Sequence, residues 1–262
     1  MICGTVPIEF PPTPPLIIGA TGGSGTRVIA RIARDAGFAL GTNLNEPEDA
    51  LDFVPLHDAW INRYLRLVNG RPGTPVAKLP TGFREAFAEA VGRLLAGEAQ
   101  QDRWGWKAPR SIYLLPLYRH VYPSLKFIHV IRDGRDMALS KNQNQLRQHA
   151  STLLTWRERF FQSRPVRSIM LWDRVNGRTA QFAEQELGSN YLQIRFEDLC
   201  NDPVGTVARL LQFVEAKGDA GKIASERIKP PGTLGRWRSA EAGLIQKLNQ
   251  VADASLRRFD YL

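Results

Sequence analysis

The chain has 262 residues, of which 43% are hydrophobic and 23% charged, and its formal net charge is +9. This size and composition predict a single α/β domain over 1–262, with room for a small lobe. No run of about 18 apolar residues occurs, so we expect no membrane span.

The N-terminal residues 1–15 are proline-rich and lack a basic segment followed by an apolar one. They predict an extended arm packed on the domain rather than a signal peptide. Cys3 and Cys200 fit neither a metal-ligand spacing nor a disulfide framework. We therefore expect a reducing, cytoplasmic location and no bound metal.

Apolar runs predict strands at 16–18, 126–131 and 191–196. Helices are expected at 25–36, 85–95, 111–121, 134–145, 168–187, 203–214 and 241–257. This alternation predicts a three-layer fold, a parallel sheet with helices on both faces. Residues 41–100 are expected to form a helical lobe on the acceptor side of the site.

Ligands of such folds bind beyond the carboxyl ends of the strands. Polar clusters follow the predicted strands at 19–27, 132–140 and 195–198, so we expect them to converge on one crevice.

The first cluster is a glycine loop between a strand and a helix. It contains Gly22, Gly23, Ser24, Gly25, Thr26 and Arg27. The glycines permit close approach to a ligand, the hydroxyls can cap the helix, and the helix N-terminus favours an anion. Thr26 stands where loops that hydrolyse ATP or GTP carry lysine, so hydrolysis of this kind is not expected. A plain glycine turn opening a core helix is the alternative.

The second cluster places Arg132 at the end of a strand and Ser140 about two helical turns further on. Such a pair can hold one phosphate, the arginine through a charged fork and the serine through its hydroxyl. The alternative is an ion-paired surface patch at the start of a helix.

The glycine loop followed by Arg132-Asp133-Gly134-Arg135-Asp136-x-x-x-Ser140 resembles the sulfotransferases that use 3′-phosphoadenosine 5′-phosphosulfate (PAPS). Three further segments, 191–203, 229–238 and 106–109, resemble the family's E-D-L strand, its basic C-terminal loop and its K-x-P element, the last in the style of the bacterial and tyrosylprotein-type branches. The resemblance spans 16–238 and implies a fold like that of P-loop-containing nucleotide hydrolases.

The resemblance also implies roles for individual residues. The glycine loop would bind the 5′-phosphosulfate, Arg132 and Ser140 the 3′-phosphate, and Phe196 would lie near the adenine. The residues implied for the C-terminal loop are Gly235, Arg236, Trp237 and Arg238. Trp237 could instead fill the core.

The chain departs from the family pattern at Gly23, where members commonly carry lysine or arginine. We favour Lys107 as the replacement cation, with Arg27 as a less direct one. A solvent-exposed lysine, or a homologue that binds nucleotide without turnover, remains an alternative.

A general base would remove the acceptor proton. Glu46 and Asp49 lie where related branches place an acidic residue, although both could simply stabilise a helix start. His57 is a third candidate.

The positive charge also fits a nucleic-acid-binding module, and the sheet also fits a kinase. The scattered arginines disfavour the first, and the missing loop lysine disfavours the second. We therefore expect a small-molecule or glycan acceptor, whose identity these motifs do not encode, and no nucleic-acid partner.

Overall fold

The computed structural model describes residues 10–96 and 102–262. Four parallel strands form one sheet in the order β2-β1-β3-β4. Their bounds are β1 (Leu16–Ala20), β2 (Gly105–Lys107), β3 (Lys126–Ile131) and β4 (Tyr191–Arg195). The predicted α/β class is confirmed. Sequence analysis missed β2, since three residues are too few to establish a period.

Helices connect and cover the strands. The α-helices are α1 (Thr26–Asp35), α2 (Val54–Leu67), α3 (Phe83–Leu95), α4 (Leu115–Val121), α5 (Gly134–Ala138), α6 (Asn144–Leu153), α7 (Trp156–Phe161), α8 (Arg164–Glu186), α9 (Phe196–Asn201), α10 (Pro203–Phe213), α11 (Ala220–Arg227), α12 (Ala242–Val251) and α13 (Asp253–Arg258). Short 3₁₀ turns are η1 (Leu51–Phe53), η2 (Pro109–Tyr113), η3 (Gly188–Asn190) and η4 (Arg236–Ser239).

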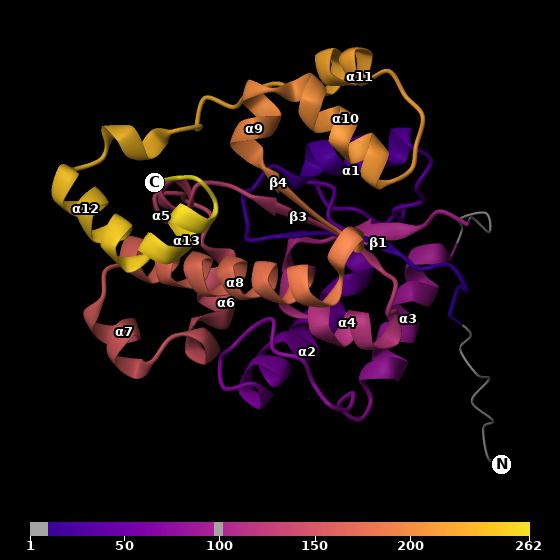
Figure 1. Cartoon of the computed structure of the whole chain (residues 1–262). Helices are drawn as coiled ribbons and strands as arrows, with labels where there is room; N and C mark the ends of the chain where they lie inside the picture. Colours follow the sequence, from indigo (N-terminus) through magenta and orange to yellow (C-terminus); the bar gives the residue numbers. More distant parts are fainter. Residues whose placement is uncertain (1–9, 97–101) are drawn as a thin grey trace.

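The two faces of the sheet carry separate cores because successive strand side chains point to opposite faces. Leu16 and Ile18 of β1 pack in a core that includes residues of α1, α10 and α11. Ile17 packs in the larger core with α2, α3, α4 and α8. Figure 1 shows the resulting layers, with α1, α10 and α11 on one side of the strands and α8, α2 and α4 on the other.

The predicted helix over 134–145 is wrong. Helix α5 ends at Ala138, and α6 begins only at Asn144. The Nε2 of Gln143 donates to the carbonyl oxygens of Met137 (3.0 Å) and Ser140 (2.9 Å), so a side chain satisfies groups that a continuing helix would have paired. The helix expected at 241–257 is likewise divided, into α12 and α13.

Residues 41–95 contribute η1, α2 and α3 beside β2. The ring of Phe53 stacks on Trp106 of β2 at a centroid distance of 4.2 Å. Of the expected N-terminal arm, Phe10 packs on Phe87 at 5.5 Å, and residues 1–9 lie outside the described part. Within that part, no helix is both long and apolar enough to cross a membrane.

Candidate active site

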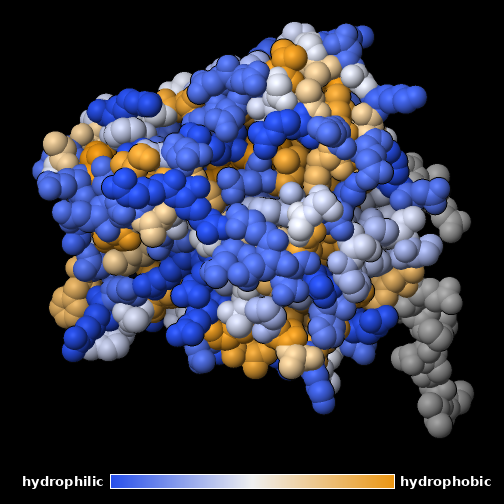
Figure 2. All heavy atoms as spheres, in the orientation of Figure 1, coloured by the Kyte–Doolittle hydropathy of each residue, from blue (hydrophilic) through white to orange (hydrophobic). Residues whose placement is uncertain are grey.

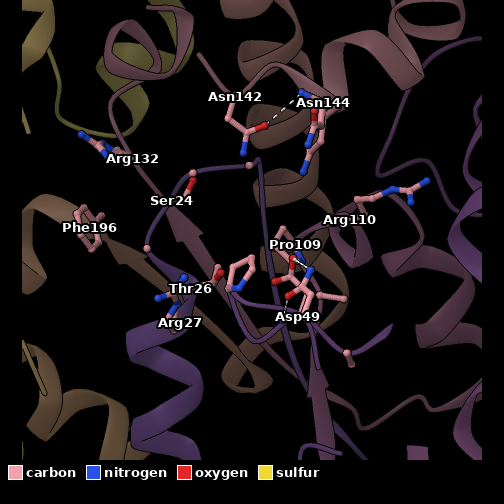
Figure 3. A pocket seen from close by; sticks show the side chains of 18 of the residues that line it. Ser24, Thr26, Arg27, Asp49, Pro109, Arg110, Arg132, Asn142, Asn144 and Phe196 are labelled. Carbon is pink, nitrogen blue, oxygen red and sulfur yellow. Dashed lines mark hydrogen bonds between the residues drawn. The ribbon is translucent and has the colours of Figure 1, made fainter. Parts of the chain in front are cut away.

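A cavity of about 620 Å³ opens at the carboxyl end of the sheet, and all four strands lead into it. The glycine loop follows β1, Arg110 lies just after β2, Arg132 follows β3, and Phe196 follows β4. Figure 3 shows Ser24, Arg132 and Phe196 on one side, and Asp49 and Arg110 on the other. The volume lies within the usual range for small-molecule sites, about 300–1,000 Å³.

The glycine loop wraps the start of α1 along one wall of the cavity. Gly25 has φ = 78°, and a Cβ there would lie 2.2 Å from the ring of Phe196. Backbone conformation and the neighbouring ring therefore both require glycine at this position. The first N–H groups of a helix lack partners within the helix, so this end of α1 offers donors and a partial positive charge to an anion.

Arg132 is buried beside this loop. Its Nη2 donates to Oδ2 of Asp136 (2.9 Å) and to the carbonyl oxygen of Thr233 (2.5 Å). Its guanidinium lies 5.6 Å from the centre of the Phe196 ring. Its Nε is a buried donor with no partner among the described residues, and its side chain lines the cavity.

Asp49 and Lys107 form an ion pair at the opposite wall. Lys107 is only 1% exposed, and its Nζ donates to Oδ1 of Asp49 and to the carbonyl oxygen of Pro47, both at 2.5 Å. Burial lowers the pKa of the Lys107 ammonium, and the Asp49 carboxylate partly offsets that effect. Asp49 lines the cavity, whereas Lys107 lies behind it, outside the set of lining residues.

His57 also lines the cavity. Its Nε2 lies 3.0 Å from the hydroxyl of Tyr118 and 3.3 Å from Oγ of Ser111. Burial, reinforced by the Arg110 charge, holds the pKa of His57 well below its usual value. The imidazole is consequently neutral at pH 7. Arg110 itself pairs with Asp58 at 2.7 Å.

Comparison with known proteins identifies the family of this chain. A model described as the sulfotransferase family matches residues 54–219, more than half of the chain. This chain belongs to the sulfotransferase family. The matched segment contains Arg132 and Asp136 but begins after the glycine loop.

Solved sulfotransferases share the fold. Sulfotransferase STF9 from Mycobacterium avium superposes with a TM-score of 0.55 at 14% identity, over 96% of this chain and 78% of that one. Sulfotransferase STF1 from Mycobacterium tuberculosis superposes with a TM-score of 0.53 at 12% identity, over 91% of this chain and 76% of that one. The sulfotransferase domain of the curacin biosynthetic pathway superposes with a TM-score of 0.51 at 14% identity, over 92% of this chain and 96% of that one. Comparison with curated proteins finds no match.

The structure of this sulfotransferase brings many of the expected residues together. The cavity is lined by Gly22, Gly23, Ser24, Gly25, Thr26, Arg27, Asp49, Arg132 and Phe196. Lys107, Ser140 and Glu46 lie outside this set. Ser140 follows the early end of α5, and its Oγ accepts from the backbone N–H of Asn142 (3.2 Å), so the expected spacing of two turns along one helix is not formed. The side chain of Glu46 is 84% exposed and pairs with Arg27 at 2.9 Å.

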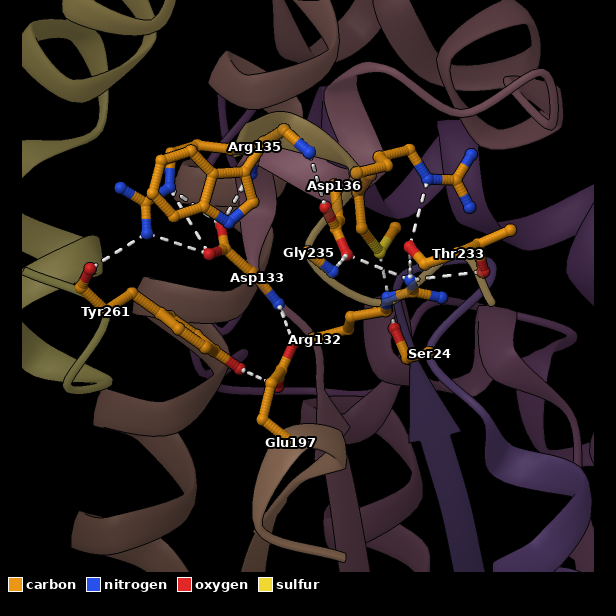
Figure 4. Close-up of polar contacts among 12 residues, drawn as sticks. Ser24, Arg132, Asp133, Arg135, Asp136, Glu197, Thr233, Gly235 and Tyr261 are labelled. Carbon is orange, nitrogen blue, oxygen red and sulfur yellow. Dashed lines mark hydrogen bonds and ion pairs between the residues drawn. The ribbon is translucent and has the colours of Figure 1, made fainter. Parts of the chain in front are cut away.

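The expected C-terminal residues 235–238 do not line the cavity; they contact the residues behind it, chiefly Asp136. The backbone N–H groups of Gly235 (2.7 Å) and Trp237 (3.0 Å) donate to the Asp136 carboxylate. Arg135 stacks on the Trp237 ring at 3.8 Å, and Arg238 lies 5.0 Å from that ring. Figure 4 shows Gly235 beside Asp136 and Thr233 beside Arg132. Arg236 and Arg238, like Gly235 and Trp237, lie outside the cavity-lining set; this segment reaches the cavity through Lys229, Pro231 and Thr233.

Sequence reasoning gave no individual role to several lining residues. They are Asn45, Asp58, Arg110, Asn142, Asn144, Gln145, Gln148, Lys229 and Thr233. Of these, Lys229 and Thr233 lie in the segment that resembled the C-terminal loop. The run Asn142-Gln143-Asn144-Gln145, directly after the arginine motif, was a usable signal, because four consecutive amides are uncommon in a buried helix. Among the described residues, no group of three or more His, Cys, Asp or Glu side chains is placed to hold a metal ion.

Proposed function

We propose that this sulfotransferase moves the sulfuryl group of PAPS to a hydroxyl or amine acceptor, leaving adenosine 3′,5′-bisphosphate. The observation that carries the proposal is one cavity with the glycine loop and Arg132 at one side and ionisable groups at the other. PAPS supplies the transferable group and its own leaving group. In the transfer, an acceptor–sulfur bond forms, the sulfur–oxygen bond to the phosphate breaks, and the acceptor proton goes to a base.

The nucleotide would lie along the glycine-loop side. The N-terminus of α1 and the hydroxyl of Thr26 would hold the 5′-phosphosulfate, whereas the Ser24 hydroxyl already donates to the carbonyl oxygen of Thr21 (2.7 Å) and shapes the loop. Arg132 lines the cavity and would hold the 3′-phosphate through its charged guanidinium, and Phe196 would pack near the adenine.

The cation that replaces the usual loop lysine is, in this proposal, Arg27. It lines the cavity from the first turn of α1, and its partner Glu46 lies in solvent, where ion pairs contribute little. Lys107 would instead act as a positioning residue, since its ammonium is committed to Asp49 and Pro47.

The general base would be Asp49. Its carboxylate reaches the cavity. Lys107 holds Oδ1 at 2.5 Å, and Oδ2 accepts a long hydrogen bond of 3.4 Å from Nδ2 of Asn45, which leaves Oδ2 able to accept a proton. His57, neutral at pH 7, is the competing base because it lines the same wall.

Ligand-induced thermal stabilisation tests the proposal directly. Ligands that bind the native state raise its stability by mass action. Adenosine 3′,5′-bisphosphate should raise the melting temperature, and AMP and ATP should have much smaller effects at equal concentration. A shift with ATP alone would refute the assignment of PAPS as donor.

A further inference from the structure

Helix α7 presents its aromatic side chains to solvent. Trp156, Phe160 and Phe161 are 59%, 74% and 73% exposed, and no residue of the helix is buried. Seven large hydrophobic side chains are exposed among the described residues, and three of them belong to this one turn and a half of helix. Single exposed apolar residues need no explanation, but a cluster marks an interaction site.

Arginines surround these rings. Arg157 lies 5.4 Å from the centre of the Trp156 ring, and Arg159 lies 5.9 Å from that of Phe160. Arg164 is exposed at the start of α8. We call Trp156, Arg157, Arg159, Phe160, Phe161 and Arg164 the aromatic–arginine patch. In Figure 1, α7 lies at the lower left, and the same corner of Figure 2 shows apolar atoms beside hydrophilic ones.

The patch carries no outward negative charge. Glu158 is the one acidic residue between 155 and 167. Its two oxygens accept from Arg174 of α8 at 2.5 and 3.0 Å, and it also caps α7 with Thr155. Because Glu158 is turned toward α8, the charges left on the solvent side are those of the arginines.

We propose that the aromatic–arginine patch docks this protein on an anionic phospholipid surface. Tryptophan and phenylalanine enter the interface of a bilayer, and arginines beside them bind lipid phosphates. A second copy of the chain is a poorer occupant, since the same patch on both copies would bring arginines against arginines. The net charge of +9 adds a long-range attraction to the same surface.

Vesicle sedimentation of the full chain tests this proposal. Binding is compared between vesicles of phosphatidylcholine alone and vesicles with about one-third phosphatidylglycerol. The unmodified chain should bind the anionic vesicles at least about tenfold more tightly, with weaker binding at high salt. The triple variant Trp156→Ser, Phe160→Ser and Phe161→Ser should lose at least about tenfold in binding, and Arg157→Gln with Arg164→Gln should lose a similar factor.

The matched control is the double variant Leu67→Ser and Val204→Ser, which removes two exposed apolar side chains elsewhere and should bind as the unmodified chain does. All variants should keep their melting temperature, because the changed side chains are exposed. Failure of the unmodified chain to bind anionic vesicles would overturn the proposal, as would undiminished binding by the triple variant. Lipid-independent self-association that the triple variant abolishes would also overturn it and would assign the patch to a second copy.

Discussion

Arg132 and Asp136 form a buried ion pair in which one carboxylate links the candidate phosphate-binding arginine to the C-terminal segment. Asp136 Oδ2 accepts from Arg132 Nη2 (2.9 Å) and from the backbone N–H of Gly235 (2.7 Å), and Oδ1 accepts from the N–H of Trp237. Asp136 is 1% exposed. Figure 4 shows Thr233 held against Arg132 by the same arrangement. The carboxylate therefore fixes both Arg132, the proposed nucleotide contact, and the C-terminal segment beside it.

Asp136→Asn should destabilise the protein strongly. The substitution leaves Arg132 buried without its counter-charge, and breaking one partner of a buried pair costs about 3–5 kcal/mol. Urea unfolding measures the loss. The control is Asp198→Asn at a more exposed pair, 3.7 Å from Arg195, which should cost less than about 1 kcal/mol. Equal losses at the two positions would show that Asp136 has no special structural role.

Arg132→Ala should weaken binding of adenosine 3′,5′-bisphosphate far more than binding of AMP. A charged hydrogen bond to a phosphate contributes about 1.5–3 kcal/mol, so the loss is about 10–150-fold for the first ligand and small for the second. Calorimetric titration of one variant with both nucleotides cancels any general effect on stability. Parallel losses would contradict the assignment of Arg132 to the 3′-phosphate.

Gly25→Ala and Gly23→Ala should differ sharply although both residues have positive φ. At Gly25 the new methyl group would overlap the Phe196 ring, whereas at Gly23, with φ = 83°, nothing lies within 4 Å. Gly23→Ala should cost about 1–2 kcal/mol from backbone strain alone and leave nucleotide affinity nearly intact. Gly25→Ala should lower both stability and affinity further. Similar melting temperatures and affinities for the two variants would mean that the loop relaxes around Phe196.

The sequence predicted what depends on local pattern. The strands at 126–131 and 191–196 were predicted because apolar residues predominate in the first segment and recur at nearly every second position in the other. The glycine loop was recognisable since its spacing is set by a short turn. Because the carboxyl ends of parallel strands meet at one edge of the sheet, these elements alone were enough to predict that Arg132 and Phe196 lie beside the loop.

What the sequence could not predict depends on contacts between distant segments. Lys107 is buried because Asp49 and Pro47, almost sixty residues earlier, fold over it. The contribution of Lys229 and Thr233 to the cavity depends on Asp136 holding the backbone of the segment that follows. Neither contact leaves a periodic trace in the sequence. The break after Ala138 likewise depends on the Gln143 side chain rather than on helix propensity.

Stability should fall as the pH drops below about 6.5. Burial lowers the pKa of His129 and His149 to about 4, and that of His57 well below its usual value. Between the unfolded and folded pKa values of these histidines, the unfolded state binds more protons. The stability that the neutral histidines contribute is therefore fully present above about pH 6.5 and is lost as the pH falls toward 4. Each histidine contributes a slope of up to about 1.4 kcal/mol per pH unit.

Urea unfolding at several pH values should show that His129→Gln reduces this slope by about one proton. The substitution also removes hydrogen bonds to Tyr191 and Asn176, so the variant is less stable at every pH, but only the slope reports titration. His120→Gln is the matched control because His120 is exposed, and its slope should equal that of the unmodified protein. An unchanged slope in His129→Gln would show that His129 takes up its proton in the folded state.

Asp49→Asn should lower kcat by at least about 100-fold, as expected for loss of a general base, with little change in the KM for PAPS. The control Glu46→Gln should change kcat by less than about threefold, because the Glu46 side chain is 84% exposed and outside the cavity wall. If Asp49→Asn keeps nearly the full kcat, Asp49 is not the base and His57 takes its place.

Lys107→Met separates the two roles considered for this lysine. If Lys107 only positions Asp49, its loss should matter no further once Asp49 is gone, so Lys107→Met with Asp49→Asn should have about the kcat of Asp49→Asn alone. If the ammonium acts on the sulfuryl group itself, the two losses in kcat multiply in the double variant.

Unfolding of the same variants provides a second readout. Asp49→Asn leaves the buried Lys107 ammonium without its counter-charge and should cost about 3–5 kcal/mol, whereas the double variant removes that charge and should recover much of the loss. If the two losses in kcat multiply, Lys107 acts in the transfer step itself. The ion pair with Asp49 would then hold the Lys107 charge beneath the cavity wall.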